Sequence, residues 1–189
     1  MELPEIPTLM TERLRLRALR GSDFEDYAAL YSDPEVTRYL LSSEPWDRGR
    51  SWRHMAFALG HWQLEGAGIW VAEERASGEF VGVIGFWAGA SWPGFELAYH
   101  LARRFWGQGY ATEGARAALA YAFNVLEKEC IISLIDPENL PSVRVAERIG
   151  ERPQGRITHL GRDFLCYGLD RTAYLREVAP AHLTALRAG

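Results

Sequence analysis

A pair of glycines behind two arginines is the first feature of this sequence that could do chemistry. Arg103 and Arg104 precede Gly107 and Gly109, and the alanine-rich run after Gly109 predicts a helix to about Leu126. The first amides of a helix have no partner inside the helix, and the helix dipole adds partial positive charge there. Because glycine lets a phosphate approach the backbone closely, the segment predicts a diphosphate site. A tight turn with solvated arginines is the alternative interpretation.

Two other phosphate-binding motifs do not fit the same segment. The dinucleotide fingerprint needs a third glycine three residues after the second, and Gly114 lies two residues too far along. The Gly-Lys-Ser/Thr ending of a P-loop is absent from the sequence.

Side chains that can carry a proton stand just before the glycine pair. Glu96 and His100 share one face of a predicted strand with Ala98, because side chains in a strand alternate with period two. A surface carboxylate and a structural histidine are the alternative interpretations. His54 and His61 are seven residues apart without a third ligand, so we interpret them as helix surface or cleft lining, and expect no metal.

The elements that must position these residues follow from hydrophobic periodicity and turn signals. Strands are predicted at 13–19, 68–74, 79–89, 94–102, 130–136, 155–160 and 162–170. Helices are predicted at 24–33, capped by Asp23, and at 35–41, 47–64, 109–126, 139–150 and from Thr172. The strand–helix–strand unit 94–102, 109–126 and 130–136 requires two parallel strands joined by a right-handed crossover. The fold class is therefore α/β (α+β), with a mixed, mostly antiparallel sheet and flanking helices.

Composition excludes several classes of protein. The 189 residues fit one domain, 1–189, and 48% hydrophobic residues are typical of a globular chain. A formal charge of 21 − 25 = −4 argues against nucleic acid and anionic membranes as partners, and no apolar run is long enough to span a bilayer. Cys130 and Cys166 lie in apolar segments, so we expect two buried, reduced thiols and a cytoplasmic protein.

Two spaced motifs carry a resemblance to a known family. Q/R-x-x-G-x-G/A is matched by Arg104, Gly107 and Gly109. A second motif, N-x-x-S-x-x-x-x-E-[KR]-x-G, is matched by Asn139, Ser142, Glu147, Arg148 and Gly150. The chain from about residue 8 to 178 resembles the GNAT superfamily of acyl-CoA-dependent N-acetyltransferases, in its ribosomal-protein N-terminal (RimJ/RimL-like) branch. Glu151 departs from the aromatic or apolar residue usual in that branch, which puts the local packing in doubt.

The resemblance implies a binding mode for acetyl-CoA. The central parallel strands, Glu96–Ala102 and Cys130–Asp136, would splay apart around the pantetheine arm. The arm would bond the backbone of the first of them, and the turn and the start of the next helix would hold the diphosphate. Asn139 would bond the arm through its side-chain amide, and Ser142 could bond it too. The implied cofactor-binding residues are His100, Leu101, Ala102, Arg103, Arg104, Gly107, Gln108, Gly109, Tyr110, Ala111, Thr112, Asn139 and Ser142.

The resemblance also implies the reaction, which is direct attack of a primary amine on the acetyl thioester in a ternary complex. The acceptor would be a protein N-terminus or a small amine. Glu96 is the first candidate base and His100 the second, while Ser142 would protonate the thiolate or only cap its helix. The amide of Leu101 or Ala102 would bond the carbonyl oxygen.

Several aromatic residues have open roles. Two roles are open for the tryptophans, which could line the acceptor pocket or pack in the core: Trp46, Trp52, Trp87 and Trp92. Tyr110 and Tyr167 could reach the cleft. A homodimer is compatible with this composition. A non-catalytic acyl-CoA-binding module and a nucleotide-binding protein are the alternative functions.

Overall fold

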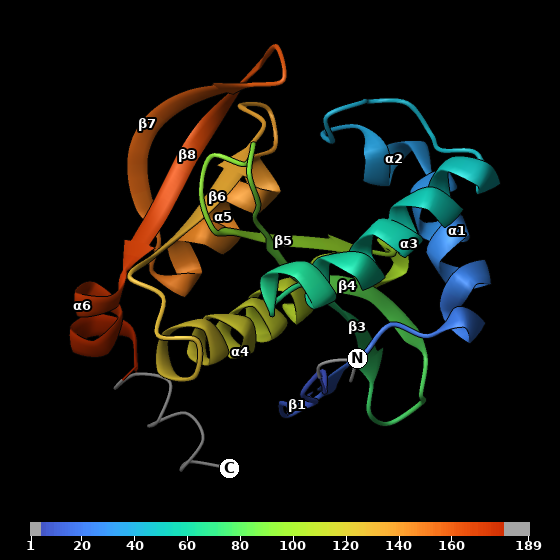
Figure 1. Cartoon of the computed structure of the whole chain (residues 1–189), viewed down its shortest axis with the longest axis horizontal. Helices are drawn as coiled ribbons and strands as arrows, with labels where there is room; N and C mark the ends of the chain where they lie inside the picture. The colour runs from blue at the N-terminus through green and yellow to red at the C-terminus, as the bar shows by residue number, and fades with distance from the viewer. Residues whose placement is uncertain (1–4, 180–189) are drawn as a thin grey trace.

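The computed structural model describes residues 5–179, and in this range the strands form one eight-stranded sheet. Their spatial order is β1-β2-β3-β4-β5-β6-β8-β7, and only the β5–β6 pair is parallel. The predicted mixed, mostly antiparallel sheet with flanking helices is therefore confirmed. Figure 1 shows β6, β7 and β8 with α5 on one side of the molecule and α1, α2 and α3 on the other.

The strands are β1 (Leu9–Met10), β2 (Leu14–Arg17), β3 (Ile69–Glu74), β4 (Phe80–Trp87), β5 (Glu96–Leu101), β6 (Cys130–Ile135), β7 (Arg152–His159) and β8 (Arg162–Asp170). The helices are α1 (Phe24–Ser32), α2 (Pro34–Thr37), α3 (Arg48–Glu65), α4 (Tyr110–Asn124), α5 (Leu140–Ile149) and α6 (Arg171–Ala173). Short helical turns cover Gly21–Asp23, Arg103–Phe105 and Tyr174–Val178.

Helix α4 connects β5 to β6 and covers one face of the sheet. Its inward face consists of small residues, and Ala115, Ala118 and Ala122 are fully buried. Gly114 allows the closest approach, because a Cβ there would lie 2.3 Å from Cδ1 of Ile84. The small residues therefore let α4 lie directly on the sheet, which fixes where its first turn meets the end of β5.

Helices α1 and α3 pack on the opposite face of the sheet. Their buried side chains Tyr27, Tyr31 and Met55 belong to one cluster with Val83 of β4. The Asp47 carboxylate caps α3 by accepting a hydrogen bond from the Arg50 amide at 2.6 Å. Two separate hydrophobic clusters thus hold the two faces of β5, which leaves this strand fixed between them.

Four local expectations differ from the structure. The Asp23 side chain does not cap α1, because its carboxylate pairs with the Arg17 guanidinium at 2.8 Å. Val125 lies beyond the end of α4 and is 63% exposed. Cys130 is exposed, whereas Cys166 is buried as predicted, so the first thiol was placed wrongly. Strand β7 begins at Arg152, three residues before its predicted start.

No helix in the described range 5–179 is both long enough and apolar enough to cross a bilayer. The same range contains no group of three or more His, Cys, Asp or Glu side chains arranged to hold a metal ion.

Candidate active site

A cleft of about 420 Å³ lies between β5 and β6 and extends to the first turn of α4. Its walls include every residue of β5 and the second half of β6 from Ser133 onward, together with the start of α5. Among the residues singled out from the sequence, those that line the cleft are Glu96, His100, Leu101, Gly107, Gly109, Tyr110, Ala111, Thr112, Asn139 and Ser142. The fold therefore brings the two spaced motifs together around one space.

The cleft exists because β5 and β6 pair at one position only. Glu96 is opposite Ile132 in a parallel register, and the Ile132 amide donates to the Phe95 carbonyl at 3.0 Å. Beyond this pair, the two strands are joined by hydrogen bonds from or to side chains instead of by backbone-to-backbone bonds. The Leu134 amide donates to Glu96 Oε1 at 3.3 Å, and Ser133 Oγ donates to the Leu97 carbonyl at 3.2 Å. We call this place, where the strands part, the strand fork; it agrees with the predicted splay.

Beyond the fork, β5 presents a free backbone edge to the cleft. In an antiparallel ladder, successive residues point their amides alternately to the two sides. The Ala102 amide donates to the Val81 carbonyl at 2.9 Å, so Ala102 and His100 point toward β4. Leu101 and Tyr99 consequently point toward β6.

This alternation corrects part of the predicted cofactor contacts. Both backbone groups of Ala102 are used within the protein, since its carbonyl also accepts from the Phe105 amide at 2.9 Å. The predicted contact of the arm with the backbone of this segment is therefore not available to the amides of Ala102 and His100, which face β4. The Leu101 amide stays a prediction, while the Leu101 carbonyl already accepts from Trp106 Nε1 at 2.7 Å.

The glycine turn leaves a row of amides without protein partners. Gly107 and Gly109 have φ values of 73° and 85°, in the left-handed region that favours glycine. In the described part of the chain, no amide from Gly107 to Thr112 donates to a protein acceptor, and the first bond of α4 joins the Glu113 amide to the Gly109 carbonyl at 3.0 Å. We call these six amides the amide cradle. Their lack of protein acceptors supports the predicted anion site, which stays a prediction.

The two arginines before the turn lie outside the cleft. Arg103 approaches Asp33 at 3.4 Å and Arg104 approaches Glu79 at 3.6 Å, and both side chains are more than half exposed. Gln108 also points away, because its side-chain amide donates to the Arg104 carbonyl at 2.7 Å. These side chains can add charge near the cradle but do not line the cleft.

Glu96 is buried at the fork, at the other end of the cleft. Its Oε2 accepts from Trp92 Nε1 at 2.6 Å, in addition to the Leu134 contact. Burial raises the pKa of the Glu96 carboxyl to about 7, and the bonds from Trp92 and Leu134 partly oppose that rise. Such a carboxyl exchanges its proton near neutral pH, which suits a general base.

His100 lies on the same strand face, two residues beyond Ala98. Its Nδ1 is 2.8 Å from the Tyr31 hydroxyl, and burial lowers the pKa of the ring to about 4. The imidazole is therefore neutral at pH 7 and holds a proton less firmly than Glu96. This difference favours Glu96 as the base.

A cluster of aromatic rings supports His100 from behind. Tyr31 stacks on Trp46 at 4.2 Å between ring centroids, and the Tyr27 hydroxyl is 2.6 Å from His54 Nδ1. Burial lowers the pKa of His54 to about 3. Trp87 packs edge-on against His54 at 5.3 Å. The cluster belongs to the core behind β5.

The predicted acceptor pocket of tryptophans is not part of the cleft. None of the four lines it: Trp46 and Trp87 are buried in the aromatic cluster, and Trp52 is 61% exposed. Trp92 has another place, because its indole holds Glu96. Packing, the alternative interpretation, describes Trp46 and Trp87.

Tyr110 lines the cleft as predicted, although its hydroxyl donates to Glu74. Two further residues differ from their predicted settings. His61 is buried, neither on the helix surface nor lining the cleft, and its Nδ1 is 2.6 Å from the Ala67 carbonyl. Tyr167 packs in a small core cluster and does not line the cleft.

Asn139 and Ser142 stand at the start of α5, across the cleft from β5. Asn139 Oδ1 caps the helix by accepting from the Ser142 amide at 3.2 Å. With this oxygen held, the side-chain NH₂ group is the donor that Asn139 can offer to a ligand. The Ser142 carbonyl accepts from the Tyr99 hydroxyl at 3.2 Å, which links α5 to β5.

The residue that sequence reasoning missed is Glu151. Its side chain is fully buried, and its Oε1 lies 2.9 Å from Ser133 Oγ. Its Oε2 is buried without a hydrogen-bond partner in the described structure. Burial raises the pKa of the Glu151 carboxyl to about 8, and the nearby Glu96 contributes. The sequence did contain a signal for it, since Glu151 is an acidic residue at a position that is usually apolar in the resembled branch. The structure places this residue at the strand fork.

Comparisons with known proteins agree with this geometry. The family model of the acetyltransferase (GNAT) domain matches residues 13–152. The uncharacterized N-acetyltransferase p20 of Bacillus licheniformis is 31% identical over 152 residues, which are 79% of this chain and 85% of that protein. The chain therefore belongs to the GNAT acetyltransferase family, and it is an acyltransferase.

Solved structures share the fold. The acetyltransferase from Agrobacterium tumefaciens str. C58 has a TM-score of 0.79 and 34% identity, over 87% of this chain and 95% of that one. RimL, a ribosomal alpha-N-protein acetyltransferase solved with coenzyme A, has a TM-score of 0.74 and 18% identity, over 87% and 98%. At 18% identity, the second likeness shows the fold alone.

Proposed function

We propose that this acetyltransferase uses acetyl-CoA and transfers the acetyl group to a primary amine by direct attack in a ternary complex. The single observation that carries the proposal is the composition of one cleft. The amide cradle, which suits a diphosphate, forms one end, and the buried Glu96 carboxyl, which suits a base, forms the other. The free edge of β5 connects them.

In this proposal, the backbone between the two ends binds the pantetheine arm. The Leu101 and Tyr99 amides, which point into the cleft, would extend the sheet by bonding the arm like an added strand. The Asn139 NH₂ group would bond the arm from the opposite wall. This arrangement places the thioester near the fork.

Glu96 would then prepare the acceptor. An α-amine has a pKa of about 7.7–8 and a lysine amine about 10.4, so most of either is protonated at pH 7. The Glu96 carboxylate takes a proton from the amine, directly or through one water, and the nitrogen attacks the acetyl carbonyl. The Leu101 amide can bond the carbonyl oxygen as negative charge develops on it.

Ser142 is the proposed acid for the leaving group. The C–S bond breaks as the C–N bond forms, and the CoA thiolate needs a proton. Ser142 lines the cleft from the first turn of α5, so its hydroxyl can donate to that sulfur. Glu96 passes the first proton to water, so that its carboxylate can accept the second proton from the attacking nitrogen. The Ser142 hydroxyl regains its proton from water, and the net products are the amide, the CoA thiol and one released proton.

The acceptor class is the open part of the proposal. RimL, whose name describes a ribosomal alpha-N-protein acetyltransferase, shares the fold, which makes a protein N-terminus one candidate. A small amine is the other. Glu35 lines the cleft and would favour a cationic acceptor of either kind.

A ligand screen followed by an activity assay tests the proposal. Acetyl-CoA and CoA should raise the melting temperature, whereas ATP and NAD should not. Thiol release should then be measured with a panel of peptides and polyamines. Stabilisation by CoA without transfer to any amine would favour the non-catalytic acyl-CoA-binding function, and stabilisation by ATP or NAD alone would favour nucleotide binding.

A further inference from the structure

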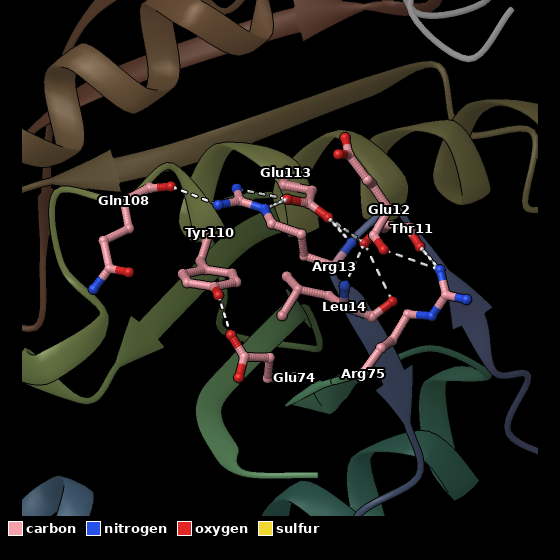
Figure 2. Close-up of polar contacts among 9 residues, drawn as sticks. All are labelled: Thr11, Glu12, Arg13, Leu14, Glu74, Arg75, Gln108, Tyr110 and Glu113. Carbon is pink, nitrogen blue, oxygen red and sulfur yellow. Dashed lines mark hydrogen bonds and ion pairs between the residues drawn. The ribbon is translucent and has the colours of Figure 1, made fainter. Parts of the chain in front are cut away.

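We propose that Arg13, on the N-terminal edge of the fold, is a positioning residue for the amide cradle. It precedes β2 in the sequence and lies 95 residues from Gln108, yet the two are in contact. The inference rests on the proposed function, because the cradle matters for activity only if it binds a diphosphate. Figure 2 shows Arg13 beside Tyr110, with Gln108 and Glu113 on either side of its guanidinium.

The first contact orients a peptide of the glycine turn. Arg13 Nη1 donates to the Gln108 carbonyl at 3.0 Å. In a trans peptide, the carbonyl and the following amide point in opposite directions. Holding the Gln108 carbonyl on the Arg13 side therefore turns the Gly109 amide to the other side, and Gly109 lines the cleft.

The second contact neutralises a carboxylate that would oppose an anion. Glu113 lies in the first turn of α4, next to the cradle. Although burial alone would raise its pKa, hydrogen bonds from Thr11 and from Arg13 lower it, so Glu113 is ionised at neutral pH. Without a partner, this charge would repel a diphosphate at the same helix end.

Arg13 supplies that partner through both backbone and side chain. Its amide donates to Glu113 Oε1 at 2.7 Å, and its Nε and Nη2 both lie 2.7 Å from Oε2. Two guanidinium nitrogens on one carboxylate oxygen, together with the backbone bond to the other oxygen, restrict both the position and the plane of the guanidinium. The fixed plane is what allows Nη1 to reach the Gln108 carbonyl.

Packing holds the guanidinium in the same place. Its Cζ lies 4.3 Å from the centroid of the Tyr110 ring, and the Tyr110 hydroxyl is anchored on Glu74. Nη2 is also close enough to the turn that a Cβ on Gly109 would be 3.4 Å away. The guanidinium therefore fills the space behind the turn.

The role of Arg13 differs from that of a ligand-binding arginine. Its side-chain nitrogens donate to Gln108 and Glu113, and Arg13 is not among the residues that line the cleft. Its effect on an anion must therefore pass through the turn and through the charge of Glu113.

The test compares Arg13→Ala with a matched control, Arg75→Ala. Arg75 belongs to the same network in Figure 2 and donates to the Thr11 and Glu12 carbonyls at 2.6 and 3.0 Å, but it does not contact the turn. Two donors should be used with each variant: acetyl-CoA, and S-acetyl-pantetheine, which has no diphosphate. Loss of the cradle geometry should affect only the first.

We expect Arg13→Ala to weaken acetyl-CoA binding roughly 10-fold, because charge-assisted hydrogen bonds are lost from a side chain that is 40% exposed. The value of kcat/KM with S-acetyl-pantetheine should stay within about twofold of the unaltered chain, and Arg75→Ala should change neither value. Adding Glu113→Gln to Arg13→Ala should recover part of the affinity, because the repelling charge is gone. Arg13→Lys keeps the positive charge but loses the planar guanidinium, so its affinity for acetyl-CoA should be intermediate.

The outcomes separate this inference from the proposed function. Unchanged acetyl-CoA affinity in a folded Arg13→Ala variant would overturn the inference alone, and so would an equal loss in Arg75→Ala or with S-acetyl-pantetheine. If Arg13→Ala does not fold, the same comparisons are made with Arg13→Lys. Absence of CoA binding by the unaltered chain would overturn both proposals.

Discussion

At one end of the cleft the main chain supplies the polar groups, whereas at the other end buried side chains supply them. The amide cradle consists of backbone donors in the glycine turn and the first residues of α4, and Arg13 contacts the turn through the Gln108 carbonyl. The strand fork consists of two carboxyls, Glu96 and Glu151, and the hydroxyl of Ser133. A fixed array of dipoles can hold an anion without titrating, and a buried carboxyl can change its charge near neutral pH. Binding and proton transfer are thus assigned to opposite ends.

Replacing the proposed base, Glu96, should have the largest effect, which is a loss of catalytic rate without a loss of CoA binding. Glu96→Gln keeps the size of the side chain but removes proton acceptance, so kcat should fall about 10²- to 10⁴-fold. The affinity for CoA should not change, because Glu96 belongs to the fork. In the unaltered enzyme, the rate should rise about tenfold per pH unit and level off near pH 7, where the Glu96 carboxyl becomes ionised. Glu96→Gln should lose this break near pH 7, because the free-amine fraction of the acceptor alone then sets the pH dependence.

Rate measurements across pH and calorimetric CoA titrations check this prediction. A Glu96→Gln variant that keeps both its rate and its pH dependence would remove Glu96 as the base and leave the fork with only a structural role.

Blocking the cradle should have the next largest effect, on binding. Gly109→Val places a β-branched side chain at a φ of 85°, and its Cβ would lie 3.4 Å from Arg13 Nη2 behind the turn. We expect CoA to bind roughly 100-fold more weakly, since backbone strain of this kind costs about 1–3 kcal/mol and the turn that carries the amides must change its shape. Isothermal titration with CoA measures the change.

Gly78→Val is the matched control for Gly109→Val. Gly78 lies in the β3–β4 hairpin with a φ of 76°, and a Cβ added there would have no atom within 4 Å, so the variant carries similar strain at a position that does not line the cleft. If both variants lose CoA equally, strain rather than the cradle would explain the loss.

The fork should also determine how stability depends on pH. The pKa of the Glu96 carboxyl is raised to about 7 and that of Glu151 to about 8, so the folded chain holds protons that the unfolded chain has already lost. The stability gained from these protons is fully present below about pH 4.3, the ordinary value, and is lost as the pH rises to about 8. The free energy of unfolding should therefore decrease from pH 5 to pH 9.

Glu151→Gln should reduce that decrease, because the amide does not titrate. We compare the free energy of unfolding of the variant with that of the unaltered chain at each pH. From pH 5 to pH 9 this difference should shift in favour of the variant by at least about 1 kcal/mol. Urea unfolding at both pH values measures this. Glu147→Gln, on the exposed side of α5, is the control, and an unchanged slope in Glu151→Gln would show that Glu151 does not titrate in this range.

The smallest effect is expected from the exposed charge near the cradle. Arg104 is 57% exposed at its side chain and lies outside the cleft. Arg104→Ala should weaken CoA binding less than about threefold at 0.15 M salt, because a solvated charge is screened. Titrations at low and high salt check this. A loss as large as that of Gly109→Val would mean that Arg104 contacts the ligand directly.

Much of the fold could be read from local patterns. The parallel pair was predicted because an alternating segment, a helix with small residues on one face and an apolar run follow one another as 94–102, 109–126 and 130–136. The glycine turn was predicted for a similar reason, since φ values above zero and free helix-start amides depend on a few adjacent residues.

Other parts of the site depend on contacts that no local pattern contains. The resemblance named the backbone of His100, Leu101 and Ala102 together as contacts of the arm, but the ladder with β4 decides which side each amide faces. The four tryptophans had two equally open roles, and only packing placed Trp46 and Trp87 in the core and Trp92 on Glu96.

The sequence by itself determined the order of the elements and the position of the amide cradle, because hydrophobic period and glycine conformation act over a few residues. Tertiary structure alone decided that Glu151 is buried beside Glu96 and that Arg13 stands behind the turn. The reason is physical. The pKa of a carboxyl depends on its exposure to solvent and on neighbouring groups, and the orientation of a turn depends on the side chains that contact it. These neighbours come from segments that are far apart in the chain, and the fold brings them together.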